Sequence, residues 1–486
     1  MSITIVGLGP GDPGTLTRQA WDLLSQSGEV YLRTGLHPTV AHLPAGLRTH
    51  TFDALYEEME DFGQVYEAIA ARILDLGRRP GGVVYAVPGH PLVGESSVIR
   101  ILARAHDEGM EVRIIDGLSF IEPVLTALGI DALDGLQLAD ATGIASAHHP
   151  ALDPGRPALV GQLYGRRLAG EVKLTLMNAY PDDHLVTLVR AAGTGDLATV
   201  SLPLYELDRG DAADHLTTLY LPPLPGGAGC AALQETIAHL RAPDGCPWDR
   251  EQTHESLRDN LLEEAYEVLA ALDAGDDDKL GEELGDLLMQ IVMHVQISTE
   301  EGTFRFADVV RAINAKLRRR HPHVFGGVAV SSTAEVLANW EAIKSDERAE
   351  AASGEAPASR LAGVPTILPA LARAQALGDR AARLGFDWPD AQGVLEKVSE
   401  EAAEIAEAAD PDAQAGELGD LLFSLVNLAR KLDVDAESAL RATCDRFTRR
   451  YSQMEAYGRE RGLDLAQMSL AEQDVLWEES KGTEEE

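Results

Sequence analysis

Two sets of five carboxylates have the residue types and the spacing that could do chemistry. The first comprises Glu263, Glu264, Glu267, Glu283 and Asp286, and the second comprises Glu400, Glu401, Glu404, Glu417 and Asp420. Within a set, pairs such as Glu263/Glu267 and Glu283/Asp286 lie four or three residues apart, which places both members on one face of a helix. Like charges at this spacing repel each other, so converging carboxylates need a cation between them. Oxygen ligands without nitrogen or sulfur favour Mg²⁺, or Mn²⁺, over zinc or copper.

A solvated acidic surface is the alternative interpretation of such acids in a sequence with 79 Asp and Glu residues. The repetition of the pattern argues against it, because the string Glu283–Leu288 returns unchanged as Glu417–Leu422. Packing could explain the repeated leucines, but it does not explain the repeated acids. The acidic motifs therefore indicate a duplicated domain.

Phosphate usually completes the coordination of a Mg²⁺ ion that carboxylates hold. Each half also carries a basic cluster downstream of its acids: Lys316, Arg318, Arg319 and Arg320 in the first, and Arg446, Arg449 and Arg450 in the second. These side chains could contact phosphate oxygens, or they could balance surface charge. The chemistry indicated is metal-assisted hydrolysis, in which one spare carboxylate orients or deprotonates a water molecule. For the histidines His254, His321 and His323 we expect hydrogen bonding rather than metal ligation.

The elements that position these residues change character near residue 222. Before it, apolar runs predict strands alternating with helices, in α/β layers around a largely parallel sheet; the strands are Ile3–Leu8, Gly82–Val87, Glu111–Ile115, Val172–Met177 and Thr199–Pro203. After it, amphipathic stretches predict helices at His254–Asp273, Lys279–Glu300, Phe306–Arg320, Thr333–Glu350 and from Leu368 onward. The predicted domains are residues 1–222, 227–348 and 362–486, with a flexible linker at 349–361.

Composition restricts the function further. The chain has 486 residues and a formal net charge of −38, which argues against a protein that binds nucleic acid or an anionic membrane through bulk charge. Three distant cysteines give no disulfide framework. The first residues have no signal-peptide pattern, and no apolar run reaches about 18 residues. We therefore expect a cytoplasmic protein.

The pattern Glu-Glu-x-x-Glu followed by Glu-x-x-Asp resembles the MazG-family nucleoside triphosphate pyrophosphohydrolases. Further similar strings are Gly245–Asp249, Gln252–His254, Arg318–Phe325, Trp340–Lys344, Gly385–Trp388 and Leu476–Glu479. The resemblance covers about residues 227–480. It implies two all-α domains, a homodimer that completes the helical bundle, and cleavage of a nucleoside triphosphate to a monophosphate and pyrophosphate.

The same resemblance implies roles for individual residues. The ten carboxylates become the metal ligands, with Glu264 and Glu401 as the catalytic members. The residues that resemble phosphate- and base-contacting positions of the second repeat are Lys344, Lys397, Arg446, Arg450 and Trp477. A tryptophan offers a stacking face that accepts any base.

The amino-terminal stretch Ile3–Gly14 is a predicted strand that runs into a glycine-rich loop. Asp12 stands where the dinucleotide-binding fingerprint has its third glycine, so NAD binding is disfavoured. The stretch instead resembles the start of S-adenosylmethionine-dependent tetrapyrrole methylases, as do Ala86–Val93, Gly117–Phe120 and Leu176–Asp182. This resemblance covers about residues 1–222, and fusions of the two families are a known arrangement.

The methylase resemblance implies a fold of two α/β lobes with S-adenosylmethionine in the cleft between them. The cofactor-binding residues it implies are Gly7, Gly9, Gly11, Asp12, Pro88, Gly89 and His90. The glycines and Asp12 could equally be turn residues. His90 replaces the aspartate usual in the second loop, which disfavours methyl transfer to a tetrapyrrole.

The first hypothesis is therefore a Mg²⁺-dependent nucleoside triphosphate pyrophosphohydrolase, in nucleotide-pool housekeeping or stress regulation, fused to a methylase-like domain. One alternative is a methyltransferase whose helical half is an accessory. Another is a helical dimer that senses nucleotides without hydrolysing them.

Overall fold

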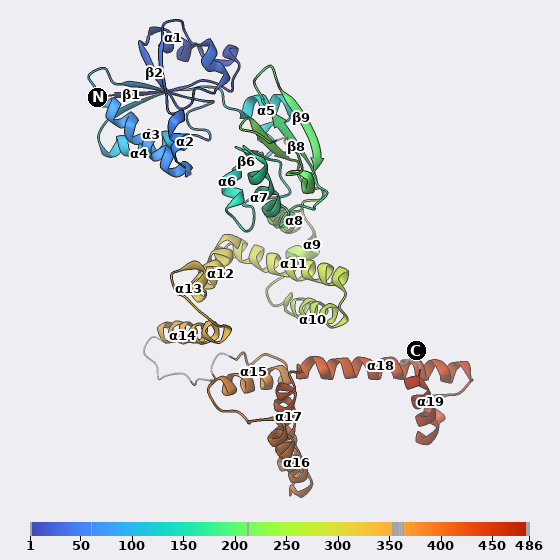
Figure 1. Cartoon of the computed structure of the whole chain (residues 1–486). Coiled ribbons are helices and arrows are strands. Elements are labelled where there is room, and N and C mark those ends of the chain that lie inside the picture. The colour runs from blue at the N-terminus through green and yellow to red at the C-terminus, as the bar shows by residue number, and fades with distance from the viewer. Residues whose placement is uncertain are drawn as a thin grey trace. The chain divides into compact units, whose positions relative to one another are not determined.

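The computed structural model describes residues 2–59, 61–210, 213–351, 359, 361 and 364–482 (Figure 1). The chain divides into two compact units. The first contains residues 1–260 and 288–303, and the second contains residues 261–287 and 304–486. In the part of the chain that the structure describes, no helix is long and apolar enough to cross a membrane.

A five-stranded parallel sheet opens the first unit, in the order β3-β2-β4-β1-β5. Its strands are β1 (Ser2–Gly7), β2 (Glu29–Leu32), β3 (Arg48–Thr51), β4 (Val83–Val87) and β5 (Glu111–Ile115). Both faces of the central strands are buried, which explains their continuous apolar runs. On one face Ile3 and Ile5 pack with α3 (Phe62–Gly77) and α4 (Ser96–Asp107), and on the other Val6 packs with α1 (Arg18–Gln26).

A second sheet follows, in the order β6-β7-β10-β8-β9. Its strands are β6 (Gln137–Asp140), β7 (Ala158–Gly161), β8 (Leu185–Arg190), β9 (Ala198–Pro203) and β10 (Thr217–Leu221). Only β6 and β7 are parallel, while β10 is antiparallel to β7 and β8, and β8 to β9. The predicted parallel layering therefore holds for the first sheet and not for this one. The short helices α2 (Asp53–Glu58), α5 (Ile121–Leu128) and α6 (Ala141–Ala145) complete the α/β region.

The predicted strand Val172–Met177 was wrong, because this segment belongs to helix α7 (Arg166–Leu176). The buried residues of α7 are Leu168, Ala169, Val172, Thr175 and Leu176. That spacing has the period of a helix, whereas the short window Val172–Met177 shows only the alternation of apolar and polar residues that a strand would share.

The rest of the chain is helical, as predicted. The first repeat contains α10 (Arg258–Ala274), α11 (Asp277–Glu301), α12 (Phe306–Arg320), α13 (Pro322–Phe325) and α14 (Thr333–Ala351), preceded by α8 (Cys230–Arg241) and α9 (Pro247–Glu251). The second contains α15 (Ala370–Arg383), α16 (Ala391–Glu407), α17 (Pro411–Lys431), α18 (Ala436–Glu460) and α19 (Leu470–Gly482). Gly275, with a φ of 64°, lies in the turn between α10 and α11. Most of the predicted linker, residues 352–358 and 360, lies outside the described residues.

Candidate metal centres and the amino-terminal cavity

Three carboxylates of the first repeat meet where α10 and α11 approach each other. Oxygen atoms of Glu264, Glu267 and Glu283 all lie within 4.8 Å of one another. The Glu283 side chain is only 2% exposed, and its Oε1 lies 2.5 Å from Lys279 Nζ. Its Oε2 is buried without a hydrogen-bond partner. A desolvated anionic oxygen beside two further carboxylates is unfavourable without a cation, so this oxygen-only donor set fits a hard divalent ion.

The pKa values of Glu267 and Glu283 are shifted by the charged groups beside them. The hydrogen bond with Glu283 and its negative charge raise the pKa of Glu267 above its usual range. The ammonium group of Lys279 lowers the pKa of Glu283. The two pKa values move apart, as expected when a cation stabilises the charged form of one of two adjacent acids.

The second repeat builds the same group from different helices. Glu401 and Glu404 on α16 and Glu417 on α17 bring their oxygens within 4.8 Å of one another. Here the most buried member is Glu401, with a side chain 6% exposed, and Lys397 Nζ lies 2.7 Å from its Oε1. Burial, followed by the charges of Glu401 and Glu417, raises the pKa of Glu404. The duplicated sequence pattern thus folds into duplicated three-carboxylate groups.

The other four predicted ligands lie outside these groups. They are Glu263, Asp286, Glu400 and Asp420. Of these, Glu400 pairs with Lys397 at 3.0 Å. Sequence spacing predicted that all five acids of a set would converge, but in the structure only three of each set bring their oxygens within 4.8 Å of one another.

The predicted substrate-binding residues are dispersed. Lys397 lies beside the second group, whereas the Arg446 guanidinium donates to Thr443 Oγ1 at 3.0 Å, and the Trp477 ring lies 5.1 Å from that of Phe447. Arg450 lies on α18. Lys344 Nζ lies on α14, 4.1 Å from the centre of the Trp340 ring.

Two members of the first basic cluster are engaged within the chain. The guanidinium groups of Arg319 and Arg320 lie 2.5 Å and 2.6 Å from Glu347. These contacts lower the pKa of Glu347 to about 2. For these two arginines the structure therefore favours charge balance over phosphate binding. The expected hydrogen bonding of His254 is confirmed, because its Nδ1 lies 2.8 Å from Nδ1 of His294.

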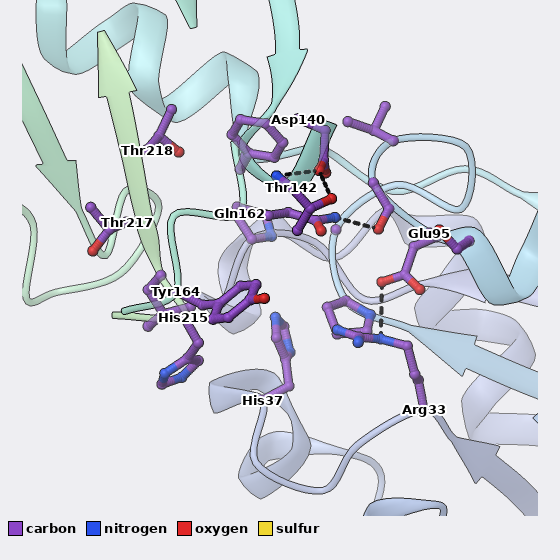
Figure 2. Close-up of a pocket in the computed structure, with 18 of the residues that line it drawn as sticks. Arg33, His37, Glu95, Asp140, Thr142, Gln162, Tyr164, His215, Thr217 and Thr218 are labelled. Carbon is purple, nitrogen blue, oxygen red and sulfur yellow. Dashed lines mark hydrogen bonds and ion pairs between the residues drawn. The ribbon is translucent and has the colours of Figure 1, made fainter. Parts of the chain in front are cut away.

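The amino-terminal region contains a cavity of about 430 Å³, lined by loops that follow strands of both sheets (Figure 2). Aromatic side chains form much of its wall: Tyr56, Phe62, Tyr66, Phe120 and Tyr164. Figure 2 shows Arg33, His37 and Glu95 gathered on one side of the cavity, with Thr217 and Thr218 across it. The Arg33 Nε and Glu95 Oε1 atoms form an ion pair of 3.0 Å.

Burial dominates the electrostatics of this cavity. It raises the pKa of Glu95 to about 7, although the charge of Arg33 opposes the change. Burial, together with the charge of Arg33, lowers the pKa of His37 to about 4. His37 is thus a neutral imidazole at pH 7, and its buried Nδ1 has no hydrogen-bond partner.

Sequence reasoning missed Arg33, His37 and Glu95 because no short motif contains them. Arg33 follows β2 directly, and Glu95 lies in the loop after β4. Charged residues just beyond the carboxyl ends of parallel strands are the signal that could have identified them.

Some of the predicted cofactor-binding residues line cavities, and others pack against backbone or stabilise loops. Pro88 and Gly89 line the large cavity, and Gly11 and Asp12 line a neighbouring one of about 300 Å³. Gly9 pairs with Gly89 through backbone hydrogen bonds of 2.8 Å and 3.3 Å. Gly7 packs against the backbone, since an added Cβ would lie 2.6 Å from the Gly89 carbonyl oxygen. His90 holds its own loop: Nδ1 accepts from the Leu92 amide at 3.0 Å, and Nε2 lies 3.4 Å from Asp116.

Comparison with known proteins gives both regions a family. The model of the MazG nucleotide pyrophosphohydrolase domain matches residues 252–325 and 390–454, which contain the two carboxylate groups. The nucleoside triphosphate pyrophosphohydrolase/pyrophosphatase MazG of Thermotoga maritima is 46% identical over 253 residues, 52% of this chain and 96% of that protein. The chain belongs to the MazG family. The nucleoside triphosphate pyrophosphohydrolase of Escherichia coli K12 is 44% identical over 254 residues, 51% of this chain and 95% of that protein.

This MazG-family chain also carries a methylase domain. The model of tetrapyrrole (corrin/porphyrin) methylases matches residues 2–208. The protein YabN of Bacillus subtilis is 42% identical over 491 residues, which covers 99% of each chain. The arrangement of an amino-terminal methylase domain followed by two MazG repeats, inferred from the motifs, is therefore confirmed.

Proposed function

We propose that the helical repeats hydrolyse nucleoside triphosphates and deoxynucleoside triphosphates to the monophosphate and pyrophosphate, with Mg²⁺ or Mn²⁺ as the metal. The observation that carries this proposal is the recurrence of one three-carboxylate group, Glu264/Glu267/Glu283 and Glu401/Glu404/Glu417, with its oxygens within 4.8 Å in both repeats. The Thermotoga and Escherichia relatives, both nucleoside triphosphate pyrophosphohydrolases by name, support it. We assign the process to nucleotide-pool housekeeping or stress regulation.

We assign the following roles in hydrolysis to residues of the two repeats. The three-carboxylate groups would hold a Mg²⁺ ion, which when bound would neutralise charge on the polyphosphate and acidify a water molecule. Glu264 or Glu401 orients that water or accepts its proton, and the remaining acids of each set complete the ligand sphere. Lys397 contacts the phosphates beside the second group, and Trp477 offers a stacking surface for the base. Arg446, Arg450 and Lys344 remain proposed substrate contacts.

We also propose that the active form is a homodimer. Leu418, Leu422 and Leu425 are 50%, 45% and 42% exposed on α17, at the spacing of one helix face. Covering such a stripe with a second copy would remove apolar surface from water. The three domains at 1–222, 227–348 and 362–486 and a cytoplasmic location belong to the same proposal.

Product analysis tests the hydrolase. Wild type should release monophosphate and pyrophosphate from the eight common nucleotides with Mg²⁺ and not with EDTA. Loss of product in Glu264→Gln or in Glu401→Gln alone would identify the working repeat, and loss only in the double variant would make both active. Glu263→Gln and Glu400→Gln, which alter the acids of each set that lie outside the three-carboxylate groups, should retain more activity than Glu264→Gln and Glu401→Gln. Nucleotide binding without pyrophosphate release would refute hydrolysis and favour a nucleotide sensor.

For the amino-terminal domain we propose S-adenosylmethionine binding at Gly7, Gly9, Gly11, Asp12, Pro88, Gly89 and His90. The match to the methylase family and the position of Pro88 and Gly89 in the wall of the cavity support it. Calorimetric titration with S-adenosylmethionine tests the proposal. Heat that disappears in Gly89→Val would support it, whereas an absence of binding to wild type would leave the domain a scaffold.

A further inference from the structure

Each three-carboxylate group has one lysine, and the two lysines come from different helices. In the first repeat Lys279 Nζ lies 2.5 Å from Glu283 and 3.1 Å from Glu282. In the second, Lys397 Nζ lies 2.7 Å from Glu401 and 3.0 Å from Glu400. In both cases the lysine bridges the most buried member of the group and an exposed carboxylate outside it.

The two lysines do not correspond in the repeat alignment. Lys397 lies four residues before Glu401, where the first repeat has Asn260 before Glu264. Lys279 lies four residues before Glu283, where the second repeat has Ala413 before Glu417. In each repeat the lysine therefore lies on the same helix as the most buried carboxylate, four residues before it. That helix is α11 in the first repeat and α16 in the second. Two positions that do not align between the repeats thus each place a lysine ammonium group beside the most buried carboxylate of a group.

We infer that Lys279 is a phosphate-binding residue of the first repeat, the spatial counterpart of Lys397, and that the first repeat therefore takes a metal-bound polyphosphate of its own. This inference rests on the proposed function. Sequence comparison between the repeats does not find Lys279, because a register alignment places Asn260 opposite Lys397.

The surroundings of Lys279 fit this role. Its side chain is 50% exposed, and that of Lys397 is 36% exposed, so each ammonium group lies at the border between the acids and solvent. A polyphosphate on a metal ion in the group would present its outer oxygens at that border. Glu282, 65% exposed, lies 3.1 Å from the ammonium group and would keep it in place if Glu283 bound the ion. The buried Oε2 of Glu283, which has no partner, is the independent sign that this group is built for a cation.

A counter-ion role is the competing explanation, and calorimetry with inorganic tripolyphosphate in excess Mg²⁺ separates the two. The probe has no base, so it reports phosphate contacts alone, and the full-length chain is used. The inference expects two sites per chain. Lys279→Ala should weaken one of them about tenfold to a hundredfold, the effect of losing one charge-assisted contact. Lys397→Ala should weaken the other, while Lys481→Ala, which removes another helix lysine paired at i,i+3, should weaken neither.

A register exchange keeps the test independent of folding defects. Lys279→Ala combined with Asn260→Lys gives the first repeat the arrangement of the second, and should restore tripolyphosphate binding. Lys397→Asn with Ala413→Lys is the reciprocal exchange. Acylation of lysines, read by mass spectrometry, gives a direct measure: tripolyphosphate with Mg²⁺ should protect Lys279, and Mg²⁺ alone should not.

The outcomes are distinct. One site per chain, abolished by Lys397→Ala and unchanged in Lys279→Ala, would overturn the inference while leaving the hydrolase intact. Tighter Mg²⁺ binding in Lys279→Ala, with unchanged polyphosphate affinity, would show a counter-ion only. Failure of the proposed function itself would appear as no Mg²⁺-dependent binding to wild type and no pyrophosphate release.

Discussion

Replacing Gly7 with alanine should destabilise the amino-terminal domain, because three backbone segments meet at this residue. Gly7 ends β1, and a Cβ atom there would lie 2.6 Å from Gly89 O, 2.7 Å from Gly117 N and 2.8 Å from Gly117 Cα. Ordinary van der Waals contact begins at 3.4 Å, so the loop after β4 must retreat by about 0.8 Å. None of the atoms belongs to a flexible side chain.

The expected cost is near the upper end of the overpacking range. Inserting a methyl group into a well-packed site costs about 1–3 kcal/mol, and here backbone on both sides prevents local relief. We expect about 3 kcal/mol, which corresponds to a fall of roughly 6–12 °C in the melting temperature of a domain of this size. Hydrogen exchange resolved to peptides, measured on the full chain, should show faster exchange in β1, β4 and β5. Pyrophosphohydrolase activity should not change.

Gly28→Ala is the matched control. Nothing lies within 4 Å of a Cβ atom built on Gly28. The substitution should change stability by no more than about 1 kcal/mol, since it mainly reduces the freedom of the unfolded chain. Equal exchange rates and equal melting in the two variants would refute the packing argument. If Gly7→Ala lost only affinity for S-adenosylmethionine, Gly7 would be a ligand contact rather than a packing residue.

Three further predictions concern titration and substrate binding. Burial lowers the pKa of His37 to about 4, so His37 contributes stability above about pH 6.5 that is lost as the pH falls toward 4. Carbon-13 NMR, with the signal assigned through His37→Gln, should show one imidazole that stays neutral down to about pH 4. Titration of this imidazole near pH 6.5 would contradict the prediction. Arg430 and Lys431 lower the pKa of Asp387 to about 2, so wild type should lose stability as the pH falls from about 4 to 2. Urea unfolding at pH 3 and 5 should show a smaller acid loss in Asp387→Asn, and an equal loss would refute the role of this ion pair. Trp477→Ala should raise KM about tenfold with a smaller change in kcat, and Trp477→Phe should recover part of it; unchanged KM would exclude base stacking.

The acidic motifs were predictable because their chemistry is local. Carboxylates three or four residues apart share a helix face whatever surrounds the helix. The recurrence of the same acids in both repeats indicates that they have a function and did not arise by chance. The position of α12 also followed from a local signal, the apolar periodicity of Phe306–Arg320. The strand predicted at Val172–Met177 was wrong because six residues are too few to distinguish the period of a helix from that of a strand.

The sequence by itself determined the family motifs, the duplication and the acids that could hold a metal, since these depend on residue type and on spacing along one helix. Only the tertiary structure decided which three acids of each five converge, because this depends on which residues of two neighbouring helices face each other. It also placed the lysine of the first group beside Glu283 on α11, and it brought Arg33, His37 and Glu95 into one cavity. Burial and contact between residues distant in sequence depend on how elements pack, and packing is a property of the whole fold rather than of any local pattern.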